Sequence, residues 1–463
     1  MKIFFFSLFF AFVTCSVSAQ DLTGSWNGVL KVSGTQLGVT IKVISENNHL
    51  RASLDVPVQG VKDLKADSIW ITDKNVTINF GLIKSVYAGK LLNDSTLNGE
   101  WQQSGFKIPL DLKKGDSKII APKRPQTPHP PFPYEAKEVV FESKKAGIKL
   151  SGTLTIPSGK GNFPAVILVS GSGPQNRDSE IFGHKPFAVI ADYLGRNGIA
   201  VLRYDDRGIG KSEGDFSKAT TYDFADDAAA GLDFLKLQKG IIPNKIGLIG
   251  HSEGGLIAPI VALRPVKPDF LVLLAAPAME IDELMLEQAR LISEANGSNP
   301  ELLKLQLKTN SQVFTLIKKG SITDSVRRQV EGIFANQIRT IAQGSLTEKD
   351  IKIQAEQITK TMTTPWFTGF MNLKPKEYLT KIKGPVLALN GSKDLQVPAK
   401  QNLEIINEIL GKNPKGILTV QELPGLNHLF QTAKTGSVSE YGQIEETFSP
   451  EALKIIANWI LKL

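Results

Sequence analysis

Residues 245–263 read KIGLIGHSEGGLIAPIVAL, and the architecture of most of the chain follows from this stretch. The apolar run KIGLIG predicts a buried strand, and GLIAPIVAL predicts the helix that follows it. At the turn between them, Gly250-His251-Ser252-Glu253-Gly254 is a G-x-S-x-G pentapeptide, whose glycines are required because a side chain would collide with the neighbouring strand or helix. We therefore expect Ser252 to be a nucleophile in a strained turn, before a helix amino terminus that favours negative charge.

Further apolar runs lie on both sides of this unit and alternate with helical stretches. They are PAVILVS (164–170), IAVLRY (199–204), FLVLLAA (270–276), PVLALN (385–390) and ILTVQEL (417–423), preceded by a hairpin of KEVVFES (137–143) and IKLSGTLTI (148–156). Continuous Val, Ile and Leu runs between helices predict a parallel sheet that is covered on both faces. Residues 137–463 are thus predicted to form an α/β domain with an eight-stranded, mostly parallel sheet.

The strand signal stops between residues 277 and 378, where helical periodicity replaces it. Because this segment leaves one strand end and returns before the next strand, we expect a helical cap over the carboxyl edge of the sheet. Within it, Trp366, Phe367 and Phe370 form an aromatic cluster that we predict to bind substrate. The alternative is that these rings only hold the cap to the body of the domain.

Residues 21–115 consist of short alternating segments separated by Gly, Asn, Asp and Ser, which predicts an all-β barrel or sandwich. Its Trp26 and Trp101 are expected in the core, and no chemistry is assigned to it. Residues 116–136 are predicted to be a semi-rigid linker, since six prolines fall between Pro122 and Pro133.

The first residues combine Lys2, a short apolar run and the small residues that precede Ala19. This pattern predicts a signal peptide over residues 1–19 and export to the periplasm or the extracellular space. The apolar run is too short for a membrane span, and the residues before Cys15 match a lipoprotein signal poorly. Cys15 is the only cysteine, so the mature chain would have neither a disulfide nor a thiol nucleophile.

The composition excludes several classes of protein. With 463 residues, 41% of them hydrophobic and 22% charged, the chain is neither disordered nor collagenous nor a coiled coil. The 54 basic and 46 acidic residues give a net charge of +8, but they are interspersed, so no nucleic-acid partner is expected. Neither a metal nor a cofactor is implied, and the oligomeric state stays open.

A serine nucleophile needs a base, and the chain has five histidines. His428 follows the strand ILTVQEL and is the expected base. His251 adjoins the serine but is expected to point away from it. The other three histidines are His49 in the β domain, His129 in the linker and His184 at a helix start. Asp394 follows PVLALN and is expected to orient the imidazole. The order Ser252, Asp394, His428 is that of the α/β hydrolases.

The oxyanion hole is expected to use the amide of Glu253 and one from the loop SGSGPQNRD (170–178), where Ser172 is preferred over Gly173. Arg177 and Asp178 are expected to brace this loop. A second pentapeptide, around Ser212, has no strand directly before it and no helix directly after it, and is not expected to be catalytic.

Residues 138–463 resemble the α/β-hydrolase superfamily. GHSEGG, SGSGPQNRD, the D-x-R-G-x-G-x-S phrase from Asp205 and GSKDLQVP are similar to secreted bacterial esterases and serine aminopeptidase-like relatives. The resemblance implies hydrolysis of a small-molecule carboxylic ester through an acyl-enzyme. The alternative is a peptidase for short peptides, in which Glu253, Glu280 or Asp282 would bind a substrate ammonium. A third class, a glycan-binding β domain beside an inactive hydrolase, is disfavoured by the complete triad.

Overall fold

The structure, a computed structural model, describes residues 22–32, 35–47, 49–59, 61–103, 106–116, 123–412 and 417–463. The predicted signal peptide, residues 1–19, lies outside the described residues. The chain divides into two units, the first formed by residues 1–57 and 61–120 and the second by residues 58–60 and 121–463. Among the described residues, no helix combines the length and the hydrophobicity that crossing a membrane requires.

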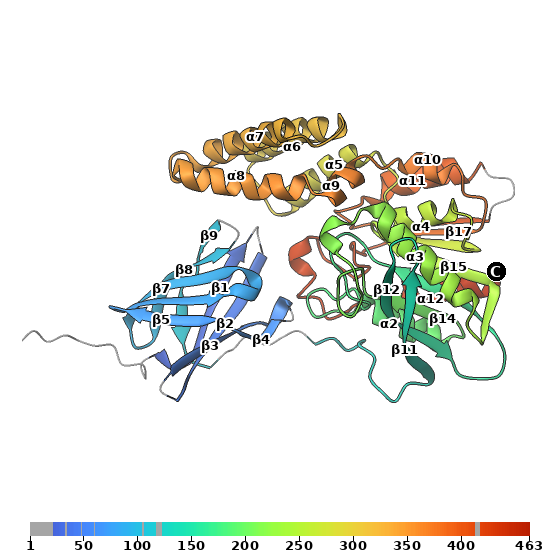
Figure 1. Ribbon diagram of the computed structural model, residues 1–463, viewed down its shortest axis with the longest axis horizontal. Coiled ribbons are helices and arrows are strands. Elements are labelled where there is room, and N and C mark those ends of the chain that lie inside the picture. Colours follow the sequence, from blue (N-terminus) through green and yellow to red (C-terminus); the bar gives the residue numbers. More distant parts are fainter. Residues whose placement is uncertain are drawn as a thin grey trace, which may run out of the picture. The chain divides into compact units, whose positions relative to one another are not determined.

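The amino-terminal unit is an antiparallel sheet that curves into a half-barrel (Figure 1). Its strand order is β4-β3-β2-β1-β10-β8-β7-β6-β5, and β9 pairs with β8. The strands are β1 (Gly24–Val32), β2 (Thr35–Glu46), β3 (His49–Val56), β4 (Val61–Lys65), β5 (Ser68–Thr72), β6 (Asn75–Phe80), β7 (Ser85–Asn93), β8 (Thr96–Gln103), β9 (Phe106–Pro109) and β10 (Leu112–Lys114). Strands β4, β9 and β10 are short and carry little apolar alternation, so a sequence pattern defines their bounds poorly.

The predicted core tryptophans are buried in this unit. Trp26 is fully buried and its indole N–H donates to the Leu22 carbonyl at 2.8 Å. Trp101 is 4% exposed and its ring lies 5.7 Å from that of Phe80. Both side chains therefore stabilise the domain rather than form a ligand platform.

The second unit contains an eight-stranded sheet with the order β11-β12-β14-β13-β15-β16-β17-β18. Its strands are β11 (Tyr134–Ser143), β12 (Ile148–Pro157), β13 (Phe163–Val169), β14 (Ala200–Tyr204), β15 (Ile241–His251), β16 (Phe270–Leu274), β17 (Val386–Gly391) and β18 (Leu418–Leu423). The hairpin strands β11 and β12 are antiparallel, and β13 to β18 pair in parallel. The carboxyl ends of β13, β15, β16, β17 and β18 therefore share one edge of the sheet.

Two apolar cores cover the faces of this sheet, because successive residues of a strand point to opposite sides. In β13, Ile167 faces a core with helices α3 (Thr221–Lys236), α4 (Gly254–Ala262) and α11 (Ala399–Leu410). Its neighbour Leu168 faces a core with α2 (Pro186–Arg196) and α12 (Pro450–Lys462). This double burial explains why the strands read as continuous apolar runs.

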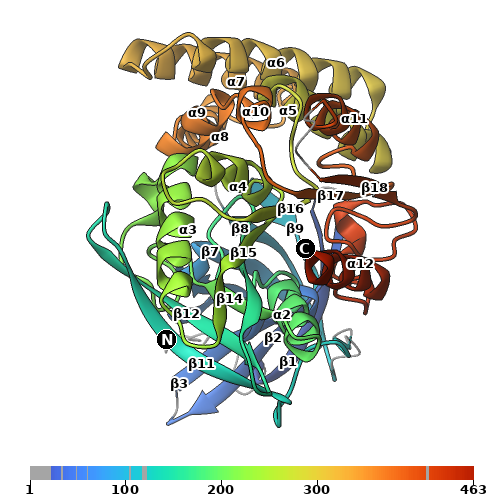
Figure 2. The same ribbon diagram turned by 90° about the vertical axis from the view of Figure 1, so that its right-hand side faces the viewer.

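Between β16 and β17 the chain forms a group of helices that Figure 2 shows above the sheet. They are α5 (Ile281–Ala295), α6 (Pro300–Lys318), α7 (Asp324–Ala342), α8 (Glu348–Met362), α9 (Pro365–Met371) and α10 (Pro375–Leu379). Side-chain caps mark several starts: Asn299, Thr323, Thr347 and Thr364 each accept a hydrogen bond from the first turn of the following helix. The inserted segment thus consists of helices from residue 281 to residue 379.

The predicted linker is not a free spacer over its described part. Arg124 donates hydrogen bonds to the carbonyls of Phe182, Gly442 and Ile444. Gln126 binds the backbone of Phe448 through both ends of its amide. The described part of the proline-rich segment is therefore fixed within the second unit by side-chain hydrogen bonds that its composition does not predict.

Candidate active site

Ser252 lies in a tight turn at the carboxyl end of β15, directly before α4. Its φ of +56° is in the left-handed region that a non-glycine residue rarely adopts, and its N–H donates to the Leu274 carbonyl at 2.9 Å. A Cβ on Gly250 would lie 2.0 Å from the Gly254 oxygen, and a Cβ on Gly254 would lie 2.2 Å from the Val169 oxygen. Backbone atoms cannot give way cheaply, so both positions require glycine.

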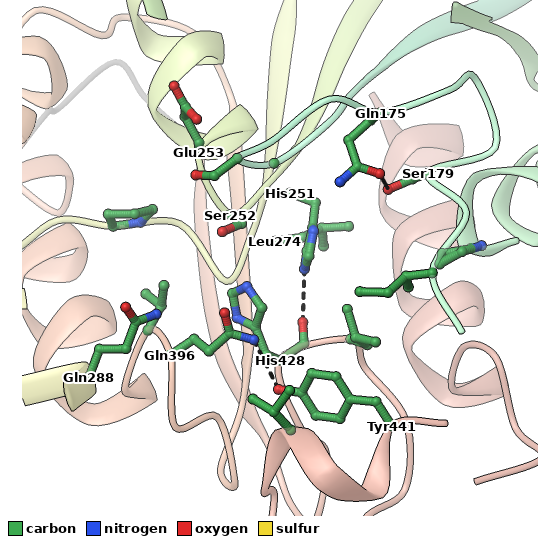
Figure 3. A pocket seen from close by; sticks show the side chains of 18 of the residues that line it. Gln175, Ser179, His251, Ser252, Glu253, Leu274, Gln288, Gln396, His428 and Tyr441 are labelled. Carbon is green, nitrogen blue, oxygen red and sulfur yellow. Dashed lines mark hydrogen bonds between the residues drawn. The ribbon is translucent and has the colours of Figure 1, made fainter. Parts of the chain in front are cut away.

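Ser252 borders a cavity of about 390 Å³ at the carboxyl edge of the sheet (Figure 3). His428 borders the same cavity, and Figure 3 shows its ring beside the serine side chain. The structure thus places two of the predicted catalytic residues at the same cavity, although 176 positions separate them in the chain (428 − 252).

Asp394 lies behind His428 and is buried. Its Oδ2 accepts a hydrogen bond from Nδ1 of His428 at 2.8 Å. Its Oδ1 accepts from the amides of Gln396 and Val397, each at 2.8 Å, so the turn after β17 fixes the carboxylate. Because a carboxylate only accepts, Nδ1 of His428 carries the proton and Nε2 is left as the basic nitrogen.

His251 does not point away from this site as predicted. Its Nε2–H donates to the backbone carbonyl of His428 at 2.8 Å, and the two rings lie 4.8 Å apart between centroids. Burial, with a smaller contribution from nearby His428, lowers the pKa of His251 to about 3, so the ring is neutral at physiological pH. His251 therefore anchors the loop of the expected base.

The expected oxyanion loop passes directly over the serine. A Cβ on Gly171 would lie 3.0 Å from Cβ of Ser252, so a larger residue there would crowd the nucleophile. Buried Asp206 fixes the loop, since it accepts hydrogen bonds from the Ser170 hydroxyl and the Gln175 amide. Both Ser172 and Glu253 line the cavity.

The loop carries the bracing pairs that the sequence predicts. Arg177 binds both oxygens of Asp205, and Asp178 pairs with Arg203. Neither Arg177 nor Asp178 belongs to the lining of the cavity.

Glu253 joins the nucleophile turn to the inserted helices. Its buried carboxylate accepts a hydrogen bond from the Thr221 hydroxyl at 2.7 Å, and from the Trp366 indole N–H at 2.9 and 3.0 Å to its two oxygens. Burial raises the pKa of Glu253, against the opposing effect of these donors. Figure 3 shows the side chain directed away from Ser252.

The aromatic cluster divides between two environments. The rings of Trp366 and Phe370 stack at 5.4 Å, and both residues line the cavity. Phe367 does not reach it: the ring is buried 6.2 Å from Phe314 of α6. Phe367 is therefore a core residue and not the predicted substrate contact, because its side of α9 faces the other inserted helices.

The two carboxylates of the inserted segment that were considered for binding a substrate ammonium, Glu280 and Asp282, pair with lysines outside the cavity. Asp282 pairs with Lys318 at 2.7 Å, and Glu280 lies 3.9 Å from Lys374. Neither carboxylate is among the described residues that line the cavity.

Two other polar residues of interest are structural. The Ser212 hydroxyl donates to the Asp205 carbonyl at 2.7 Å and accepts from the Ser151 amide at 2.9 Å, so the second pentapeptide braces β12. His184 is fully buried, and its ring nitrogens contact the Thr447 hydroxyl and the Tyr441 carbonyl.

Three glutamines that the sequence does not single out also line the cavity, namely Gln175, Gln288 and Gln396. A usable signal exists for two of them, since Gln175 lies in the oxyanion loop and Gln396 follows Asp394 by two positions. Nothing in the helical pattern distinguishes Gln288 from a solvated residue. Over the described ranges, no cluster of three or more His, Cys, Asp or Glu side chains has the geometry to hold a metal.

A serine in a tight turn after a parallel strand, with an aspartate–histidine pair at the same sheet edge, is the arrangement of an α/β hydrolase. The model of the serine aminopeptidase S33 family matches residues 184–431, more than half of the chain. The chain belongs to this family, and the predicted superfamily is thereby confirmed.

The chain is similar to two curated hydrolases. It is 27% identical over 338 residues to esterase EstD of Thermotoga maritima, covering 71% of each chain. It is 36% identical over 113 residues to thiohydrolase aneE of Aspergillus aculeatus, covering 24% of this chain and 33% of that one. A solved esterase structure from Pyrococcus furiosus matches 71% of this chain and 93% of its own at 18% identity, with a TM-score of 0.41.

Proposed function

We propose that this protein hydrolyses neutral carboxylic esters, with Ser252, His428 and Asp394 as the catalytic triad. The observation that carries this proposal is the absence of an available charge in the cavity. The described lining residues include no lysine, arginine or aspartate, and the carboxylate of Glu253 already accepts from two donors. Binding a charged substrate group there would require its desolvation without a counter-charge, which is unfavourable.

The same observation argues against an aminopeptidase. A free amino terminus is an ammonium at neutral pH, and its recognition calls for an accessible carboxylate. Glu253 is only 2% exposed and points away from Ser252 (Figure 3). The similarity to an esterase of Thermotoga maritima also favours ester substrates.

The proposed chemistry is hydrolysis through an acyl-enzyme. Ser252 Oγ attacks the ester carbonyl carbon as its proton passes to Nε2 of His428, while Asp394 stabilises the resulting imidazolium. The amides of Glu253 and Ser172 donate to the oxyanion. Collapse of the intermediate expels the alcohol, which takes the proton from His428 and leaves the serine acylated. Water then gives a proton to His428 and attacks the acyl carbon, which releases the acid and restores the serine.

Two further features belong to this proposal. The helices α5 to α9 act as a cap, since Leu284 and Met285 of α5 and Trp366 and Phe370 of α9 supply apolar lining. The protein is exported to the periplasm or beyond after cleavage at Ala19, which amino-terminal sequencing of the mature protein tests.

The test is initial-rate hydrolysis of p-nitrophenyl acetate, butyrate and octanoate beside aminoacyl p-nitroanilides. Ester turnover is expected for the wild type and lost in Ser252→Ala. The matched control is Ser212→Ala, which changes the serine of the second pentapeptide and leaves the cavity lining intact; its folding is checked by thermal unfolding.

Each outcome is informative. Anilide turnover above ester turnover would assign the protein to the peptidases. Ester turnover that persists in Ser252→Ala would disprove the assignment of the nucleophile.

A further inference from the structure

Three glutamine side chains interrupt the apolar lining of the cavity. Gln175 lies in the loop after β13, Gln288 on α5 and Gln396 in the turn after β17. Figure 3 shows Gln288 and Gln396 on one side of Ser252, next to His428, and Gln175 on the opposite side. The polar groups are therefore distributed around the nucleophile and not confined to one rim.

These amides keep hydrogen-bonding capacity that no other group in the described part of the chain uses. Nε2 of Gln396 donates to the Tyr441 hydroxyl at 3.0 Å, and its Oε1 has no partner among the described residues. Oε1 of Gln175 has only a long contact with the Ser179 hydroxyl, at 3.4 Å. Among the described residues, the Gln288 amide has no hydrogen-bond partner at all. The cavity thus offers both donors and acceptors to whatever occupies it.

The surroundings of Gln288 make its amide selective. Leu284 and Met285 from the same helix and Trp366 and Phe370 from α9 also line the cavity. A purely apolar substrate that displaced water from this region would leave the amide without a hydrogen-bond partner, which is unfavourable. A substrate with a polar group at that point would avoid this cost, which is how a polar site rejects an analogue that lacks the group.

The charge of the cavity restricts the polar group further. No cationic side chain lines the described cavity, so a substrate carboxylate or phosphate has no counter-charge. An amide is matched by a neutral hydroxyl, carbonyl or amide group.

We infer that the natural substrate is an ester that carries an uncharged hydroxyl or amide group, and that Gln288 and Gln396 bind this group. The inference rests on the proposed esterase function and names the substrate class for the same site. Gln288 and Gln396 are accordingly specificity residues, which touch the substrate away from the scissile bond.

The experiment compares matched esters, with the released acid titrated at constant pH. In the acyl arm, ethyl 3-hydroxybutyrate and ethyl 6-hydroxyhexanoate are measured against ethyl butyrate and ethyl hexanoate. In the alcohol arm, 2-hydroxyethyl butyrate is measured against propyl butyrate. We expect the hydroxylated ester of one arm to have a kcat/KM about tenfold higher than its plain counterpart, the factor that about 1.4 kcal/mol gives.

The variants Gln288→Met and Gln396→Met keep the side-chain length and remove the amide. Both are expected to bring the ratio of hydroxylated to plain ester towards one, whereas Gln357→Met, an exposed position on α8, keeps the wild-type ratio. Equal turnover of both members of every pair, or a preference that survives in both cavity variants, would overturn the inference alone. Failure of the wild type on every ester would refute the esterase proposal and the inference with it.

Discussion

Replacing Asp394 by asparagine tests the assignment of roles most directly. The side-chain Oδ1 of asparagine can still accept from the amides of Gln396 and Val397, which the carboxylate binds at 2.8 Å each. The new NH₂ group, however, would face Nδ1 of His428, where Oδ2 now accepts at 2.8 Å. Two donors cannot face each other, so His428 is expected to change tautomer, accept at Nδ1 and carry its proton on Nε2.

The expected loss is large because the protonated Nε2 can no longer take the proton of Ser252. A histidine held in the wrong tautomer costs on the order of 10⁴-fold in kcat, or about 5.4 kcal/mol of barrier. Stability should change little, since the two backbone bonds to Oδ1 remain. We expect a fall in Tm of less than about 4 °C.

The assay is the initial rate on p-nitrophenyl butyrate with thermal unfolding measured in parallel. Asp282→Asn is the control, because Asp282 pairs with Lys318 away from the cavity. If folded Asp394→Asn kept more than a tenth of the wild-type kcat, the tautomer argument would be refuted.

Two further predictions concern buried groups near the site. Trp366→Phe keeps a ring but removes the N–H that donates to Glu253, so we expect the free energy of unfolding to fall by about 1.5–3 kcal/mol. We also expect kcat to fall, because the Glu253 amide is displaced. An unchanged denaturant midpoint together with an unchanged kcat would contradict the role given to this hydrogen bond. Burial, with nearby Arg124, lowers the pKa of His184 to about 4, from 6.5. As the pH falls, His184 takes up a proton in the unfolded chain before it does so in the folded chain. The contribution of the neutral His184 ring to the free energy of unfolding is therefore complete above pH 6.5 and is lost as the pH falls towards 4, by up to about 3 kcal/mol. Urea unfolding at several pH values measures this decline, and His184→Gln should flatten it; an equal slope in the variant would show that other groups cause it.

The sequence was most informative where the constraint is local. Gly250 is required by the Gly254 oxygen, 2.0 Å from a Cβ and within the same turn, and Gly254 is required by the Val169 oxygen of the neighbouring strand β13, at 2.2 Å. Both requirements appear in the sequence as one short glycine pattern. Asp394 and His428 follow predicted strands directly, and parallel strands bring their carboxyl ends to one edge. That principle is sufficient to expect the two side chains to meet, as they do at 2.8 Å.

The sequence was least informative about side-chain orientations that depend on how helices and loops pack against each other. Trp366 and Phe367 are neighbours in sequence, yet successive residues point about 100° apart on a helix, so one lines the cavity and the other fills the core. The orientation of His251 depends on the backbone of His428, which belongs to a loop far along the chain.

Local patterns of glycine and apolar residues therefore predict the strand, the turn and the helix, because residues close together in the chain form these patterns. The order of the expected triad follows from the order of the predicted strand ends. The lack of an available charge in the described cavity lining, the link from Glu253 to Trp366 and the inward position of Gln288 arise from the packing of separate segments. They depend on the three-dimensional fold, because no short stretch of sequence contains both partners of such contacts.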